Sequence, residues 1–205
     1  MTTIFSLLAA GAMGIGLLSG VAEAGAASPS QQDTPFAGMV IVPASADPAT
    51  GTAADERRSA FTRGEIIDFN APVPEGDIIV DTRRNRLYFV LGGGKAVAYR
   101  VASARKGFQW QGSHEVTAKA KWPSWRPPQS MRKRKPELPR FMAGGPDNPL
   151  GARALYLGSS IYRIHGTNEP ESIGKAASSG CIRMLNEDVS ELYPHVRIGA
   201  RVTVR

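Results

Sequence analysis

Cys181 is the only cysteine in this chain of 205 residues, and His165 lies sixteen residues before it. Since a lone cysteine cannot form an intrachain disulfide, it is retained either as a small apolar packing residue or for its reactivity. It lies in the segment Ser-Ser-Gly-Cys-Ile-Arg-Met (178–184), where Gly180 permits backbone angles that other residues resist. We therefore expect a turn that displays the thiol, with neighbouring backbone N–H groups facing a reacting carbonyl oxygen.

His165 is the histidine best placed to activate this thiol. A free thiol has a pKa near 8.5, so a nearby base or positive charge must raise the thiolate fraction at neutral pH. His165 follows the apolar segment 161–164 and precedes Gly166, a position from which a strand delivers a side chain into a cleft. His114 is expected on a sheet face and His195 at the surface. We expect His165 to act as general base, with a backbone carbonyl such as that of Gly166 holding its second ring nitrogen.

Other polar groups near Cys181 bear on substrate and metal binding. Arg183 has the planar fork that pairs with a carboxylate, and its alternative is an ion pair with Glu187 or Asp188. Zinc takes three or four protein ligands, and one cysteine with one well-placed histidine falls short of that number. The sequence therefore predicts no metal site and no cofactor.

Short stretches rich in β-branched and aromatic residues predict a mainly β domain. Residues 77–81, 86–91 and 96–101 are separated by turn-forming residues and predict a three-strand meander. One short helix is expected at 187–193, with Asn186 as its N-cap. Further strands are expected at 114–121, 154–157, 161–165 and 202–204.

The N-terminal part of the chain predicts export. The apolar segment 4–18 precedes Ala22-Glu23-Ala24, a small-x-small cleavage pattern, so residues 1–24 are interpreted as a signal peptide. The alternative is a permanent membrane helix, but the run is shorter than the ~20 residues that span a bilayer. Residues 25–64 hold few large apolar side chains and predict a flexible linker. Residues 65–205 remain as one domain, in the periplasm or cell envelope, with no stable membrane span after signal cleavage.

Positive charge is concentrated between residues 100 and 140. This stretch holds eleven Lys or Arg against two Glu, whereas the whole chain carries a net charge of +7. It also contains three tryptophans and several prolines, so it predicts a long basic loop. The loop is interpreted as a solvated or packing surface, as a contact for an anionic wall polymer, or as a nucleic-acid contact. Export argues against the last, so we expect no nucleic-acid partner.

Three segments together resemble a known family. They are Ile-His-Gly-Thr-Asn (164–168), the segment 178–184 around the thiol, and Asn-Pro-Leu-Gly-Ala-Arg-Ala-Leu-Tyr-Leu (148–157). Over about residues 77–205 the chain resembles the L,D-transpeptidase catalytic domain, the YkuD-like family of bacterial cell-wall enzymes. Many members carry histidine immediately before the Gly-Cys pair, where this chain has Ser179. A second imidazole beside the thiol is therefore absent.

The resemblance implies a β-sandwich catalytic domain with a short helix and a long basic loop. It also implies acyl transfer on peptidoglycan stem peptides, which serve as donor and acceptor. In that scheme Cys181 attacks the carbonyl of the third stem residue, His165 protonates the departing D-alanine, and a thioester forms. An amine from a second stem or from a wall-linked protein then takes the acyl group. With water as acceptor, the same pair of residues gives an L,D-carboxypeptidase or endopeptidase.

The resemblance also assigns roles to residues around the cysteine and histidine. Gly180, Ser179 and Gly166 are expected to orient the catalytic groups or to stabilise the oxyanion. Tyr156 and Arg183 are expected to contact the substrate. A hypothesis from another class is a non-catalytic wall-binding module that uses the basic stretch 100–140.

Overall fold

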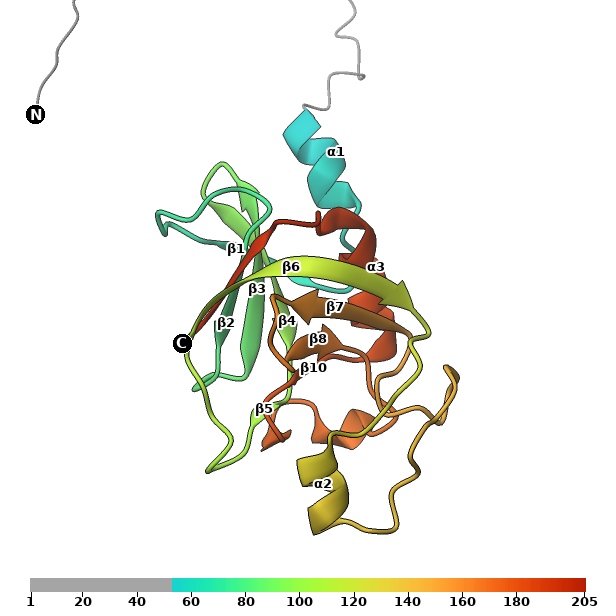
Figure 1. Ribbon diagram of the computed structural model, residues 1–205. Helices are drawn as coiled ribbons and strands as arrows, with labels where there is room; N and C mark the ends of the chain where they lie inside the picture. The colour runs from blue at the N-terminus through green and yellow to red at the C-terminus, as the bar shows by residue number, and fades with distance from the viewer. Residues whose placement is uncertain (1–52) are drawn as a thin grey trace, which may run out of the picture. The chain divides into compact units, whose positions relative to one another are not determined.

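The computed structural model describes residues 53–205, with side chains from residue 55 (Figure 1). The predicted signal peptide and most of the predicted linker lie outside the described residues. The elements follow in chain order as α1 Ala53–Ser59, β1 Glu65–Asp68, β2 Ile78–Asp81, β3 Arg86–Gly92, β4 Lys95–Arg100, β5 Ser103–Ala104, β6 Gly112–Lys121, α2 Gln129–Arg134, β7 Arg153–Leu157, β8 Arg163–His165, η1 Pro170–Ser172, β9 Ala176–Ser178, β10 Ile182–Arg183, α3 Asn186–His195 and β11 Arg201–Val204.

The described chain is mainly β, as the sequence predicts, and its larger sheet is mixed. Nine strands pair in the order β1-β4-β3-β2-β11-β6-β7-β8-β10, and β5 pairs with β9 separately. The predicted meander is present, because β2, β3 and β4 pair antiparallel in succession. Two pairs in the large sheet are parallel, β11 with β2 and β10 with β8.

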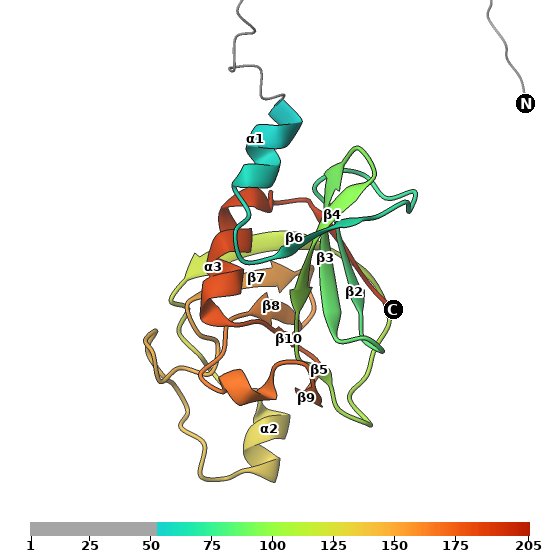
Figure 2. The ribbon, with the colours of Figure 1, turned by 180° about the vertical axis from the view of Figure 1, so that it is seen from behind.

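Both halves of the large sheet contribute to one core. In Figure 1 the strands β6, β7 and β8 run across the direction of β2, β3 and β4. Figure 2 shows α3 lying over β7, with which it is in contact. Buried side chains from all three regions join in one cluster that includes Ile78, Val80, Leu87, Val97, Leu155, Leu157, Ile164, Ile182, Val189 and Leu192. The core thus packs against one face of β8 and β10 and leaves the opposite face of these strands available for a site.

The segment before β1 is attached to this core. Phe61 is buried, and its ring lies 5.9 Å from that of Phe89 and 4.4 Å from that of His195. The Glu191 carboxylate accepts hydrogen bonds from the backbone N–H groups of residues 62, 63 and 64 at 2.8, 2.9 and 3.2 Å. The hydroxyl of Tyr99 donates to the same carboxylate at 2.8 Å. Residues 61–64, the last residues of the predicted linker, are therefore attached to the folded domain.

Replacing Glu191 by glutamine should destabilise the domain by about 1–3 kcal/mol, because three backbone N–H groups lose a charged acceptor. Burial alone raises the pKa of Glu191, but its hydrogen bonds outweigh this effect and hold the pKa below its usual value. The stabilisation is therefore present at neutral pH and disappears as pH falls below about 4. Urea unfolding at pH 7 and pH 3.5 measures both effects. The control is Glu187→Gln, an exposed glutamate of the same helix; equal stability of the two variants at pH 7 would contradict the prediction.

Three local features differ from the sequence-based expectations. The helix α3 spans 186–195, and Asn186 is its first residue rather than an N-cap; its side chain bonds to the backbone of Ala152 and Thr167, next to the ends of β7 and β8. The basic loop contains a helix, α2, that was not predicted. The residues after Cys181 form a short strand, β10, because β8 supplies a parallel partner that local sequence cannot indicate. Within residues 53–205, no helix has the length and apolar character needed to cross a bilayer.

Candidate active site

A short turn stabilised by Ser178 presents Cys181. The buried Ser178 hydroxyl accepts a hydrogen bond from the N–H of Gly180 at 3.1 Å and donates to the carbonyl of Cys181 at 2.5 Å. Gly180 has φ of 118°, a backbone conformation that residues with a Cβ rarely adopt. The N–H of Gly180, an expected oxyanion donor, is thus bonded to Ser178 in this structure. Ser179 lines the pocket that contains the thiol.

Two aromatic rings support the same turn. The indole N–H of Trp110 donates to the carbonyl of Gly180 at 2.8 Å. Trp110 stacks on Tyr162, with ring centroids 4.5 Å apart and an interplanar angle of 6°. A Cβ atom at position 180 would overlap the Tyr162 ring. Trp110 therefore packs against the cysteine turn and helps to hold it in place.

Gly180→Ala should slow alkylation of Cys181 at least tenfold and destabilise the fold by about 1–3 kcal/mol, because the new methyl group displaces either the turn or the Tyr162 ring. Alkylation kinetics and urea unfolding measure these changes. Gly112→Ala is the matched control, since Gly112 has a similar φ of 132° but nothing within 4 Å of an added Cβ. If both variants react at the same rate, close packing against Tyr162 is not what positions the thiol.

His165 ends β8 and is held in one orientation. It is 4% exposed, and its Nδ1 lies 2.5 Å from the carbonyl oxygen of Gly166. Since only a protonated nitrogen donates to a carbonyl, this contact places the proton on Nδ1 and leaves the Nε2 lone pair free. Burial lowers the pKa of His165 to about 3, and the charges of Arg183 and Arg163 act in the same direction. The imidazole is therefore neutral at neutral pH and can accept a proton.

Asn186 fixes the backbone around this histidine, a function that the sequence did not suggest. Its Oδ1 accepts hydrogen bonds from the N–H groups of Ala152 at 2.9 Å and Thr167 at 3.2 Å, and its Nδ2 donates to the carbonyl of Thr167 at 2.9 Å. A Cβ at Gly166 or Gly151 would overlap Oδ1. The two glycines thus allow one amide to join α3 to the ends of β7 and β8.

Parallel pairing of β8 and β10 brings the cysteine and the histidine to one pocket. Ile164 pairs with Ile182, and both are buried in the core. Because side chains alternate along strands, the next pair, His165 and Arg183, lies on the opposite face. Cys181 directly precedes β10 and lines the same pocket as His165, which has a volume of about 450 Å³. The other two histidines are not among the residues that line it.

The thiol itself is partly accessible to solvent. Cys181 is a free, half-buried cysteine whose Sγ lies 3.9 Å from the carbonyl oxygen of Ile161. Burial raises the pKa of Cys181, while Arg163 and the charge of Arg183 act in the opposite direction. Burial is the larger effect, so the pKa of the Cys181 thiol lies above its ordinary value and the thiol is protonated at neutral pH.

The two expected substrate contacts lie in different surroundings. Arg183 lines the pocket and forms an ion pair with Glu169 at 2.5 Å, not with Glu187 or Asp188 as considered from the sequence. Asp188 instead pairs with Arg63 at 2.8 Å. Tyr156 is not among the residues that line the pocket. Its ring lies 5.2 Å from the guanidinium carbon of Arg163, so Tyr156 supports a pocket residue.

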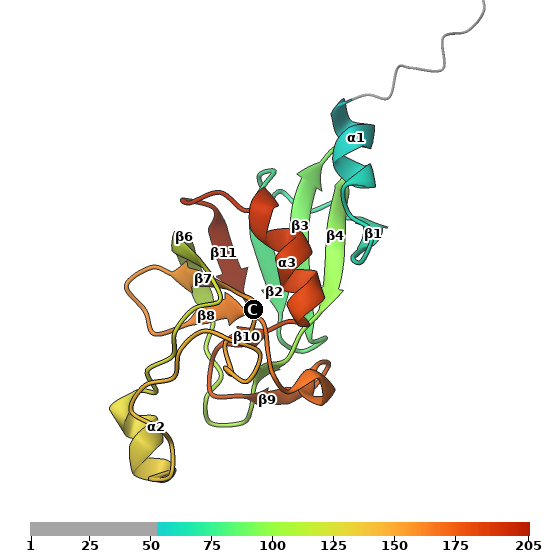
Figure 3. The ribbon, with the colours of Figure 1, turned by 90° about the vertical axis from the view of Figure 1, so that its right-hand side faces the viewer.

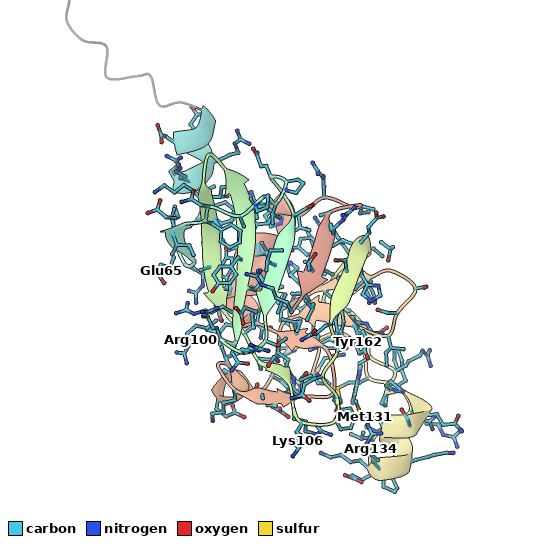
Figure 4. The ribbon with its side chains drawn as sticks, turned by 90° about the vertical axis from the view of Figure 1, so that its left-hand side faces the viewer. Glu65, Arg100, Lys106, Met131, Arg134 and Tyr162 are labelled. Carbon is cyan, nitrogen blue, oxygen red and sulfur yellow. The ribbon has the colours of Figure 1, made fainter. Side chains whose placement is uncertain are left out.

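The basic loop covers one side of the pocket. Figures 1 and 3 show α2 at the end of the domain opposite α1, and Figure 4 labels Met131 and Arg134 on it. Both residues line the pocket together with Tyr162. The loop also contributes Trp125, Pro128, Lys135, Leu138, Pro139 and Met142 to the lining. Its wall is thus largely apolar, and the loop is a packing element as well as a charged one.

Buried Asn148 holds together the two ends of the segment 123–143, which contains α2. Its Nδ2 donates to the carbonyls of Pro123 at 3.1 Å and Ala143 at 2.8 Å, and its Oδ1 accepts from the N–H of Leu150 at 2.9 Å.

Around the pocket, the cationic side chains outnumber the anionic ones: Arg105, Arg134, Lys135, Arg163 and Arg183 against Asp147 and Glu169. Within residues 55–205, no three His, Cys, Asp or Glu side chains gather as metal ligands would.

Comparison with known families identifies the domain. Residues 75–204 match the family model described as YkuD, the L,D-transpeptidase catalytic domain. The match covers more than half of the chain and includes β2, the histidine strand, the cysteine turn and β11. The chain belongs to the L,D-transpeptidase catalytic domain family.

Individual relatives agree with this assignment. The probable L,D-transpeptidase ErfK/SrfK of Escherichia coli K12 is 35% identical over 134 residues, which are 62% of this chain and 43% of that protein. The probable L,D-transpeptidase YbiS of the same strain is 36% identical over 138 residues, 63% of this chain and 44% of that protein. The chain thus spans less than half of the length of these relatives. The crystal structure of L,D-transpeptidase 3 from Mycobacterium tuberculosis shares the fold, with a TM-score of 0.52 at 15% identity over 62% of this chain and 60% of that one.

Proposed function

We propose that this protein is a cysteine acyltransferase that acts on peptidoglycan stem peptides. The observation that carries the proposal is the shared pocket of Cys181 and His165, inside the region that matches the family. His165 is neutral and has its Nδ1 bonded to a carbonyl, so its Nε2 can take a proton from the thiol. This combination supports nucleophilic attack on a carbonyl.

The reaction proceeds in two half-reactions. First, the Sγ proton moves to His165 Nε2 while sulfur attacks the carbonyl carbon of the third stem residue. Collapse of the tetrahedral intermediate breaks the peptide bond, and the histidine returns the proton to the amine of the departing D-alanine. Second, an amine from another stem or from a wall-linked protein attacks the thioester, loses a proton to His165 and restores the thiol. Ser179 and Gly166 adjoin the two reacting groups and orient them.

The charge of the pocket supports an anionic peptide as ligand. Its cationic side chains outnumber its carboxylates, and stem peptides carry free carboxylates that such a surface attracts. Arg183 binds one of these carboxylates when it exchanges Glu169 for the substrate. The apolar wall formed by α2 and its flanking residues excludes water from the thioester.

The proposed setting is the periplasm or cell envelope. Residues 1–24 act as an export signal, the linker that precedes the packed residues 61–64 acts as a tether, and the domain acts where peptidoglycan is accessible. The composition of the N-terminal part and the class of the family support this location.

Incubating the purified protein with a disaccharide tetrapeptide, and following products by mass spectrometry, tests the function. We expect release of D-alanine and formation of cross-linked dimers. Tripeptide without dimers would make water the acceptor and define an L,D-carboxypeptidase. If no D-alanine is released and wall-pelleting depends on Arg132, Lys133, Arg134 and Lys135, the protein is a wall-binding module instead.

A further inference from the structure

Arg163 is a charged residue in the pocket to which the reaction above assigns no task. It is the first residue of β8 and lines the pocket together with Cys181. Because side chains alternate along a strand, Arg163 lies on the same face as His165, while Ile164 between them points into the core. The cysteine directly precedes β10, the parallel neighbour of β8, so Arg163 and the thiol are neighbours across the ladder.

The contacts of Arg163 hold its charge close to the sulfur. Its Nη1 donates to the carbonyl of Ile161 at 3.3 Å, and the same carbonyl lies 3.9 Å from Sγ of Cys181. On its other side the guanidinium lies over the ring of Tyr156. This stacking restricts a long side chain that would otherwise be free to swing into solvent.

One nitrogen of this side chain lacks a partner. Arg163 Nε is buried, and across the part of the chain that the structure describes it is the one buried side-chain nitrogen or oxygen without a hydrogen bond. A buried donor left unpaired destabilises the folded state, so a site that keeps one is expected to use it in another state. A thiolate at Cys181 is a negatively charged acceptor that the protonated thiol does not provide.

We propose that Arg163 pairs with the thiolate of Cys181 and thereby sets the pH at which this thiol reacts. The inference rests on the proposed function, in which Cys181 is the nucleophile. The guanidinium stays protonated throughout, and the proton that leaves Sγ goes to His165 Nε2. The pKa of the thiol supports the same view, since burial raises it and the backbone N–H and side chain of Arg163 lower it.

Other charged groups also face the pocket and must be separated from this effect. Arg183 faces the thiol from β10, but its charge is paired with Glu169. Arg105 lines the pocket from the segment after β5, and its guanidinium carbon lies 4.3 Å from the centroid of the Phe108 ring. The remaining charged residues of the lining are Arg134, Lys135 and Asp147. Arg105 is therefore a matched control, because its removal takes the same charge from the same pocket.

The rate of alkylation by iodoacetamide, measured from pH 5.5 to 10, tests the proposal. In Arg163→Gln we expect the midpoint of the pH–rate profile to rise by about one pH unit. This rise corresponds to a tenfold lower thiolate fraction at pH values below the midpoint. The rate at pH 7.5 should fall only about threefold, because a more basic thiolate is more nucleophilic. The limiting rate at high pH should not fall. Arg163→Lys keeps the charge but lacks Nε, so its midpoint should lie between those of the parent and the Gln variant.

Two results would overturn the proposal. One is a pH–rate midpoint in Arg163→Lys or Arg163→Gln that equals that of the parent protein. The other is a midpoint in Arg105→Gln that shifts as far as that of Arg163→Gln. Circular dichroism checks folding, and if the Gln variant does not fold, the Lys variant decides. Alkylation needs no peptidoglycan, so this result is independent of the proposed function. If the midpoint shifts in Arg163→Gln but the parent protein releases no D-alanine, the inference about Arg163 stands and the proposed acyltransferase function is rejected.

Discussion

Cys181→Ala should reduce D-alanine release from the tetrapeptide to the level without enzyme, a loss of at least ~10³-fold. The reason is that no other described side chain in the pocket can form a thioester, since the chain has a single cysteine. The thiol is half-buried and carries no structural hydrogen bond closer than the 3.9 Å contact with Ile161. The unfolding free energy should therefore stay within ~1 kcal/mol of the parent.

Mass spectrometry of the intact protein provides a second measurement for the same variant. The parent chain should gain the mass of the acyl group during turnover, and the alanine variant should not. Urea unfolding controls for folding. Undiminished D-alanine release by the alanine variant would remove Cys181 from the mechanism, whatever the other residues of the pocket do.

His165→Asn should lower the rate of D-alanine release by about 10²–10⁴-fold while the domain stays folded. Asparagine keeps an N–H near the position of Nδ1, so the hydrogen bond to the Gly166 carbonyl survives, but the base at Nε2 is lost. Single-turnover kinetics should locate the loss in acylation, because the first proton transfer has no acceptor. A rate within threefold of the parent would show that another group accepts the proton.

The same variant should alter the response of stability to acid. The folded parent keeps His165 neutral down to about pH 3, whereas the unfolded chain binds a proton near pH 6.5. The unfolded state thus binds more protons between these values, and parent stability falls as pH drops through this window. His165→Asn lacks this contribution and should lose less stability between pH 6.5 and pH 4. Urea unfolding at both pH values measures the difference, and parallel losses in the two proteins would contradict it.

Local pattern was sufficient to predict most of the strands. The meander of β2, β3 and β4 is formed by neighbours in sequence, so segments rich in β-branched and aromatic residues, with turn residues between them, specify it. Strand β10 has only two residues and exists because β8, distant in sequence, supplies its ladder. Helix α2 has no buried residues and hence no apolar periodicity to reveal it.

The candidate site shows the same division between local and distant information. His165 and Cys181 were singled out by residue type and by their short flanking motifs. Asn186 was interpreted as a helix cap, because its bonds to Ala152 and Thr167 depend on how three elements meet. The ion-pair partner considered for Arg183 was likewise wrong, since Glu169, the residue before η1, pairs with it instead of a residue of α3. Arg163 carries no motif of its own, and only the pairing of two strands places it beside the thiol.

The parallel pairing of β8 with β10 also explains why the cysteine follows the histidine at a distance of sixteen residues. Two parallel neighbours need a connection that returns the chain to the same end of the sheet, which takes a dozen or more residues. Here that return path holds η1 and β9. The interval in sequence is therefore the length of a crossover and not a chemical requirement. Homologues with a longer or shorter return path can keep the same reacting geometry, provided that the ladder keeps Ile164 opposite Ile182.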